Sequence, residues 1–259
     1  MAMDRLENLK NIIMYLMADE HVSHRIPSSL EERQRMMRAL MNVWSPRPIS
    51  EAFLKMQDAE LQIQREEKGI VEISDITPQT SDIRLWQGDI TRLKADAIVN
   101  AANAQALGCW APLHNCIDNC IHSAAGIQLR KECADKMQGR LLATGDAIIT
   151  KGYNLPAKHV IHTVGPIIPD GIPTKEQEEQ LAQCYRSCLD LAEKNGLESI
   201  AFCCISTGVF HFPNQRAAEI AIETVKSYPR HSLKTIVFNV FLDKDRDIYE
   251  QLLGACPMA

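Results

Sequence analysis

The 259-residue sequence contains no long apolar run and no excess of positive charge. Nowhere do about eighteen apolar residues follow one another, and charges interrupt the N-terminal stretch MAMDRLENLKNIIMYLMADE, so we expect neither a membrane span nor a signal peptide. The formal net charge of -5 gives no general attraction to nucleic acid or anionic lipid. We therefore expect no nucleic-acid or membrane partner, and a phosphate-bearing ligand must be held by local contacts.

The cysteines lack the pattern of a disulfide framework or a zinc finger. Nine cysteines are an odd number, and without an expected export signal they favour reduced thiols and a cytoplasmic location. The stretch GCWAPLHNCIDNCIH, residues 108–122, holds three cysteines and two histidines without a Cys-x-x-Cys pair. A metal site, a reactive thiol cluster and a group of core residues all fit that composition.

The sequence changes character near residue 75. Before it, apolar residues recur at helical spacing in three segments; Ser29 with Glu32 forms a capping box before the second, and Ser50 can cap the third. After it, short β-type runs alternate with helical patterns, which predicts an α/β fold with a mostly parallel sheet covered on both faces. We therefore expect a helical extension over residues 1–75 and an α/β domain over residues 76–259. The expected strands lie in 83–87, 96–101, 145–151, 158–164, 199–205 and 234–241, and the helices after residue 75 in 116–137, 175–195, 214–228 and 244–253.

Three polar loops follow predicted strands, at the edge where such sheets bind ligands. Their sequences are QGDIT (87–91), NAANAQALGCWAPLHNC (100–116) and STGVFHFP (206–213). In the last loop, Ser206, Thr207 and Gly208 precede a helical pattern, so backbone N–H groups can approach an anion at a helix N-terminus. A tight turn between strand and helix fits the same fragment.

Six sequence blocks occur in a fixed order along the second part of the chain. They are QGDIT, DAIVNAAN, IDNCIHSAAG, TGDAIITKGYNLPAKHVIHTVGP, ISTGVFHFP and FNVFLDKDRDIY. Together they resemble the macrodomain that binds ADP-ribose, over residues 82–253. The resemblance is greatest to the hydrolytic macrodomains that remove mono-ADP-ribose from proteins, and it implies a mixed, mostly parallel sheet sandwiched by helices.

One segment departs from the common macrodomain pattern. Where the family usually has a glycine run before Val-Asp-Gly, this chain has GCWAPLHNCIDN. This segment resembles the zinc-dependent macrodomains, which also carry an N-terminal helical extension. The resemblance implies one zinc ion per chain, held by Cys109, His114 and Cys116, with a fourth position left open for chemistry. The alternative is a redox-sensitive thiol pair, which needs a cysteine of low pKa.

Other cysteines and histidines near this segment are expected to be structural. Cys120 and His122 match a segment that metal-free relatives also have, so we expect them to pack on the helix that follows. His159 and His162 lie on the predicted strand 158–164, and we expect core or surface roles for them.

The resemblance also implies which residues bind the nucleotide. Asp89 would accept a hydrogen bond from the adenine amino group, with Ile90 beside it, and Phe241 would pack on the adenine ring. Asp89 as a turn or capping residue and Phe241 as a core residue are the alternatives. The diphosphate would lie against the loop Ser206, Thr207, Gly208, Val209 and Phe210.

The resemblance implies that Asn103 binds the distal ribose, with Phe210 against the same sugar and Asn100 as a further substrate-binding residue. Turn residues are the alternative for the two asparagines. Asn103 and Asp118 are the implied catalytic pair that positions the ribose or the nucleophile. Asp118 as a partner of the helix dipole is the alternative. The implied reaction is hydrolysis of the bond between the distal ribose and a protein side chain, with an ester-linked acidic residue expected. Zinc would either activate water or hold the sugar.

The resemblance finally implies partners. The zinc-dependent branch occurs beside a sirtuin-type transferase that modifies a lipoyl carrier protein, so a mono-ADP-ribosylated protein of that kind is the expected substrate, acted on by a monomer. Two other functions fit the same residues: a non-catalytic ADP-ribose reader, and a deacetylase of O-acetyl-ADP-ribose.

Overall fold

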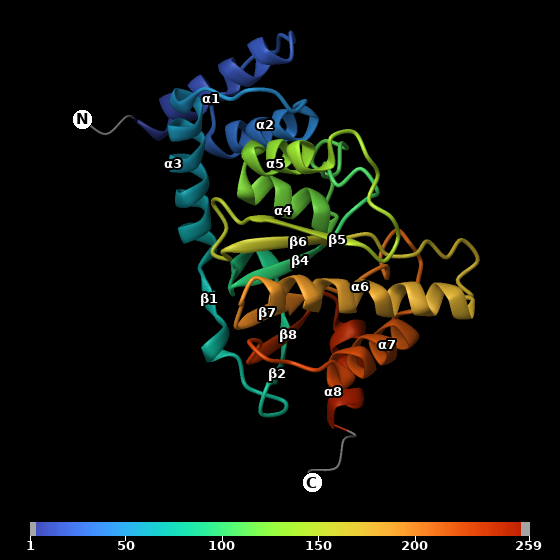
Figure 1. The fold of residues 1–259 in the computed structure, drawn as a ribbon. Coiled ribbons are helices and arrows are strands. Elements are labelled where there is room, and N and C mark those ends of the chain that lie inside the picture. Colours follow the sequence, from blue (N-terminus) through green and yellow to red (C-terminus); the bar gives the residue numbers. More distant parts are fainter. Residues whose placement is uncertain (1–3, 255–259) are drawn as a thin grey trace.

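The computed structural model describes residues 4–254, and these form a layer of helices stacked against a helix-covered sheet (Figure 1). Residues 1–3 and 255–259, which begin and end the two expected parts and include Cys256, lie outside the described residues. Within residues 4–254, no helix is both long and apolar enough to cross a membrane.

Three helices form the N-terminal part, as the helical spacing predicts. Ser29 and Ser50 are the N-caps of the second and third, and each side-chain oxygen accepts a hydrogen bond from a backbone N–H three residues later. The apolar faces of the helices meet in their own core, which also contains Ile127 from the following part. The helices are α1 (Arg5–Asp19), α2 (Leu30–Val43) and α3 (Glu51–Lys68).

A six-stranded sheet forms the centre of the rest, in the order β2-β8-β7-β4-β6-β5. Neighbouring strands are parallel except β5 and β6, which are antiparallel, so the predicted fold class is confirmed. Each predicted apolar run contains one strand. The strands are β2 (Ile83–Gln87), β4 (Ala97–Ala101), β5 (Ala147–Lys151), β6 (His159–Thr163), β7 (Ser199–Phe202) and β8 (Thr235–Val240), and β1 (Val71–Glu72) pairs separately with β3 (Leu93–Lys94).

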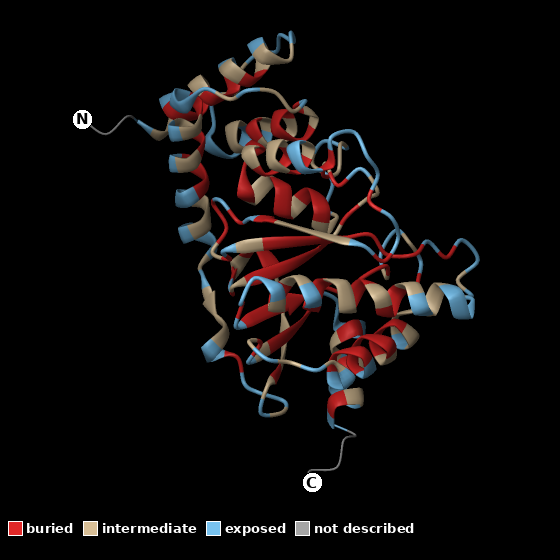
Figure 2. Ribbon diagram, in the orientation of Figure 1, coloured by how far each residue is buried: buried red, intermediate tan, exposed pale blue. Residues whose placement is uncertain are grey.

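Helices cover both faces of the sheet (Figure 1), and buried residues concentrate in the strands and in the helix faces turned toward them (Figure 2). On one side lie α4 (Ile117–Ala125) and α5 (Ile127–Met137), and on the other α6 (Lys175–Lys194), α7 (Asn214–Ser227) and α8 (Asp243–Gly254). Short 3-10 turns, η1 (Ile73–Asp75) and η2 (Ile90–Arg92), flank β2.

The single helical pattern expected over residues 116–137 is wrong, because two helices share that span. Gly126 separates them with a φ of 103°, a left-handed conformation that favours glycine. A β-carbon there would lie 2.7 Å from Nε2 of Gln57. The same glutamine accepts a hydrogen bond from the N–H of Ile127, so α3 fixes the break between α4 and α5.

Candidate functional site

Two thiols and an imidazole meet in the loop between β4 and α4. The ligand atoms of Cys109, His114 and Cys116 all lie within 4.8 Å of one another, and Sγ of Cys109 is 3.7 Å from Nδ1 of His114. The two cysteines are half-buried and His114 is exposed. We call residues 108–116 the metal loop, because this donor set fits a metal ion with one side open to solvent.

The surroundings of Cys116 bear on the choice between a metal site and a reactive thiol pair. Burial, with a smaller contribution from the neighbouring Cys109, raises the pKa of Cys116 to about 12, against the hydrogen bond from the N–H of Asn119, which lowers it. A thiol with a raised pKa is a poor nucleophile at neutral pH, which argues against the redox alternative for Cys116. A bound cation reverses this effect, because it stabilises the thiolate directly.

The metal loop has unusual backbone geometry. Leu113 in the loop and Ala106, two residues before it, have φ angles of 60° and 55°, in the left-handed region that few non-glycine residues adopt. Gly108 has a φ of 81°, and a β-carbon there would lie 2.8 Å from the ring of His122. Such conformations persist only where the surroundings hold them, and they concentrate at functional sites.

A buried polar group lies directly beside the loop. Nδ2 of Asn100, at the end of β4, donates to Oδ1 of Asp118 at 2.7 Å and lies 3.1 Å from Nδ1 of His162. Nδ2 of Asn103 donates to the carbonyl of Gly108 at 3.1 Å and lies 3.5 Å from Oδ2 of Asp118. Burial raises the pKa of Asp118 to about 6, against the hydrogen bond from Asn100, which lowers it. The structure thus brings Asn100 and Asn103, expected to bind the substrate, together with the expected catalytic residue Asp118.

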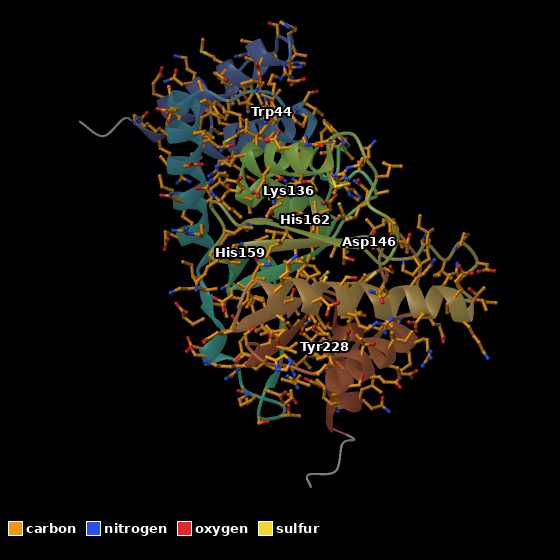
Figure 3. The ribbon with its side chains drawn as sticks, viewed as in Figure 1. Trp44, Lys136, Asp146, His159, His162 and Tyr228 are labelled. Carbon is orange, nitrogen blue, oxygen red and sulfur yellow. The ribbon has the colours of Figure 1, made fainter. Side chains whose placement is uncertain are left out.

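Two of the three histidines expected to be structural, His159 and His162, have polar partners within hydrogen-bond distance. His162 is fully buried in β6, and its Nε2 lies 3.0 Å from Oγ1 of Thr150 (Figure 3). His159 is the first residue of the same strand, and its Nδ1 lies 3.2 Å from the backbone carbonyl of Thr150. His122 is also buried, but neither ring nitrogen has a hydrogen-bond partner among the described residues. Its Nε2 lies 3.6 Å from Oδ1 of Asp118.

A second set of potential ligand atoms, from His122, Cys133 and His162, also lies within 4.8 Å. No sequence signal could have grouped these residues, because each belongs to a different element.

The loop after β7 folds back on itself at the same edge of the sheet. Ser206 has a φ of 66°, and its buried hydroxyl has no hydrogen-bond partner among residues 4–254. A β-carbon at Gly165 would lie 1.9 Å from that hydroxyl, so only glycine permits this close approach. Oγ1 of Thr207 donates to the carbonyl of Cys204 at 3.0 Å. Gly208 and Val209 are exposed, and Phe210 is half-buried.

Ser206, Thr207 and Gly208 precede α7 but do not stand at its N-terminus, because the helix begins at residue 214, where the sequence predicts it. Helix α7 begins at Asn214, six residues beyond Gly208, and its N-cap is Pro213, which has no side-chain oxygen to act as a cap. Left-handed residues at Ser206 and His211 turn the chain before the helix starts. The loop itself, rather than the end of α7, therefore offers its backbone N–H groups.

The remaining predicted contacts lie near the ends of β2 and β8. Oδ1 of Asp89 accepts hydrogen bonds from the backbone and side chain of Thr91, so Asp89 does cap η2. Its Oδ2 lies 3.3 Å from Nζ of Lys68, an ion pair with α3 that the sequence did not indicate. Ile90 is buried. Phe241 is 71% exposed, so the alternative of a core residue is wrong.

Comparisons with known proteins agree with this architecture. A family model described as Macro domain matches residues 99–221. A protein of Treponema medium named protein-ADP-ribose hydrolase is 50% identical, over 94% of this chain and 97% of its own. A Fusarium oxysporum protein named probable bifunctional ADP-ribose hydrolase/ADP-ribosyltransferase is 40% identical, over 95% of this chain and 46% of its own.

Solved structures are similar as well. The crystal structure of a Trypanosoma brucei macrodomain in complex with ADP has a TM-score of 0.65 and 33% identity, over 85% of this chain and 97% of that one. The family model, the relative that is half identical over nearly the whole length, and the shared fold agree, so the chain belongs to the macrodomain family.

Proposed function

We propose that the protein is a hydrolase that releases ADP-ribose from mono-ADP-ribosylated protein side chains. The observation that carries this proposal is the position of the Cys109, His114 and Cys116 cluster next to the buried Asp118. A binding module has no use for such an open set of metal ligands, whereas a metal-dependent hydrolase uses one. The name of the Treponema relative is consistent with this activity.

The proposed reaction is hydrolysis at C1 of the distal ribose. Water forms a new bond to C1 while the bond from C1 to the carboxyl oxygen of an acidic side chain breaks, which yields ADP-ribose and the free carboxylic acid. One zinc ion, held by the three ligands of the metal loop, supplies Lewis-acid polarisation of an oxygen at this centre when bound.

Asp118 and Asn103 are proposed to position the ribose or the water. Oδ1 of Asp118 is held by Asn100 at 2.7 Å, which fixes the orientation of the carboxyl group. Oδ2 has only a long contact of 3.5 Å with Nδ2 of Asn103, so it retains capacity to accept a hydrogen bond from a hydroxyl or a water. Nδ2 of Asn103 carries a second N–H whose contact with Asp118 is this long one, so that N–H can donate to the ligand.

The nucleotide is proposed to bind across the loops at the strand ends. The exposed ring of Phe241 offers a face on which adenine can stack, and Asp89 offers an acceptor for its amino group. The unpartnered hydroxyl of Ser206 can donate to a diphosphate oxygen. Residues 76–259 would then form the catalytic domain, with residues 1–75 as its helical extension.

The modified substrate is proposed to be an ester-linked protein, with a lipoyl carrier protein modified by a sirtuin-type transferase as its natural source. The Fusarium relative carries both activities in its name, which is consistent with such a pairing. We propose that the protein acts as a cytoplasmic monomer.

Time-resolved release of free ADP-ribose from an ester-linked, mono-ADP-ribosylated protein tests the proposal. We expect release to occur and to stop after treatment with a zinc chelator, because the metal acts at the reacting centre. Binding without any release would identify a reader instead. Faster turnover of O-acetyl-ADP-ribose than of modified protein, at equal enzyme concentration, would identify a deacetylase.

Replacing Asp89 with Ala should weaken ADP-ribose binding by about 1 to 3 kcal/mol, the range for a buried polar group that loses its partner. Calorimetry on the folded variant measures this. A ribose phosphate without adenine should bind almost equally to both proteins. Lys68→Ala, which removes only the ion pair to Asp89, is the matched control and should change affinity less. Unchanged affinity in Asp89→Ala would rule out the adenine contact.

A further inference from the structure

The backbone of the metal loop is held by side chains of the N-terminal extension. Nη2 of Arg38 donates a hydrogen bond to the carbonyl of His114 at 2.7 Å. Oδ1 of Asn42 accepts a hydrogen bond from the N–H of Leu113 at 2.9 Å. Both side chains come from α2, and both contacts fall at His114 or at the residue before it.

The Asn42 side chain is buried and hydrogen-bonded at both ends, unlike a typical surface side chain. It is 1% exposed, and its Nδ2 donates to Oγ of Ser123 on α4 at 2.9 Å. Both ends of the amide are therefore used, which fixes its orientation. The N–H that it binds belongs to Leu113, whose left-handed φ of 60° sets the direction in which the chain enters His114.

The buried guanidinium of Arg130 joins the start of the metal loop to the end of α2. Nη1 of Arg130 donates to the carbonyls of Asn42 and Trp44, at 2.8 and 2.9 Å, where the last carbonyls of a helix lack partners of their own. Its Nη2 donates to the carbonyl of Cys109 at 3.3 Å, and the guanidinium lies 4.2 Å from the ring centroid of Trp110. Burial lowers the pKa of Arg130 to about 10, so it stays charged at neutral pH.

We propose that α2 is part of the metal site, with Arg38 and Asn42 as positioning residues that hold His114 in its ligating place. The inference rests on the proposed function only in requiring that the metal loop bind zinc. Groups that orient metal ligands typically change metal affinity about 10- to 100-fold when they are removed. The extension would then be needed for the site itself and not only for the stability of the fold.

The zinc affinity of the full chain, measured by competition with a coloured chelator, tests this proposal. We expect Arg38→Ala and Asn42→Ala to bind zinc about 10- to 100-fold more weakly than the parent. Arg33→Ala is the matched control on the same helix, because the Arg33 guanidinium bonds only to the carbonyls of Pro27 and Leu6, inside the extension. It should lower thermal stability without changing zinc affinity.

Two further measurements separate positioning from general damage. Cobalt-substituted Arg38→Ala and Asn42→Ala should show altered thiolate-to-metal and d–d absorption bands, which report ligand geometry. Asn42→Asp, which keeps an acceptor for the N–H of Leu113, should restore part of the affinity that Asn42→Ala loses. Should Asn42→Ala fail to fold, Arg38→Gln at a half-buried position makes the same test.

The outcomes distinguish this inference from the proposed function. If the parent binds zinc and the folded Arg38→Ala and Asn42→Ala variants bind it equally well, the positioning role is wrong and the proposed function stands. Equal losses in Arg33→Ala and Arg38→Ala would also overturn it, since the effect would then be loss of stability. A parent protein that binds no zinc overturns both.

Discussion

Replacing His114 with Ala is expected to lower the rate of ADP-ribose release at least about 100-fold, near 2.7 kcal/mol, while much of the affinity for free ADP-ribose remains. The reason is that stabilisation of the transition state needs the metal contact at the reacting centre. Affinity in the ground state is spread over adenine, ribose and diphosphate. The residues proposed to bind adenine and the diphosphate lie on other loops than His114. Rate and affinity should therefore diverge.

Single-turnover release and calorimetric binding measure the two quantities. His231→Ala, at an exposed histidine in the segment between α7 and β8, is the control and should match the parent in both. Circular dichroism and a thermal melt must first show that the His114→Ala protein is folded, because a loop that loses a metal ligand can collapse. A folded, zinc-free His114→Ala protein that works at the parental rate would mean that the metal is structural and that the proposed mechanism fails.

The second large effect concerns metal content, which should fall from about one zinc per chain to nearly none in Cys116→Ser. The cluster in this loop consists of two thiolates and one imidazole. Loss of one thiolate leaves only two protein ligands, which is too few for tight zinc binding. Serine is preferred to alanine here because Cys116 is the N-cap of α4. A serine keeps the cap, so metal loss is not confused with loss of the helix start.

Elemental analysis of protein prepared without chelator measures the stoichiometry. Cys120→Ala should retain the metal, since Cys120 lies on α4 outside the ligand cluster and its Sγ contacts Nη2 of Arg38 at 3.8 Å. Metal loss in Cys120→Ala, or full zinc content in Cys116→Ser, would show that the ligand assignment is wrong.

Local sequence patterns were sufficient for most of the fold. The apolar runs predicted where strands occur because buried parallel strands need apolar side chains on both faces, and Ser29 and Ser50 marked helix starts because capping is a local contact. The break at Gly126 was missed because apolar periodicity continues through it, and the residue that fixes it, Gln57, lies in another helix. The start of α7 at Asn214 was predicted, but the left-handed turns of the loop before it were not, because Ser206 and His211 carry no strong turn signal.

In the candidate site too, contacts between residues close in sequence were predictable and contacts between distant residues were not. Cys109, His114 and Cys116 are close in sequence, so their grouping could be predicted from spacing and resemblance. The contacts of Arg38 with His114 and of Asn42 with Leu113 join residues more than seventy positions apart, and no local pattern indicates them. The pairing of Lys68 with Asp89 likewise depends on how α3 packs on the sheet domain.

The placement of Arg130 ties the two parts of the chain into one cooperative unit. Arg130 is 2% exposed, and its guanidinium donates to carbonyls at the end of α2. Ile127, one turn earlier on α5, is buried in the core of the N-terminal helices. If those helices opened alone, a buried cation would lose hydrogen-bond partners and an apolar side chain would enter water. Partial opening is thus costly compared with complete unfolding, so the extension and the sheet should melt together and a protease should find no stable intermediate between them.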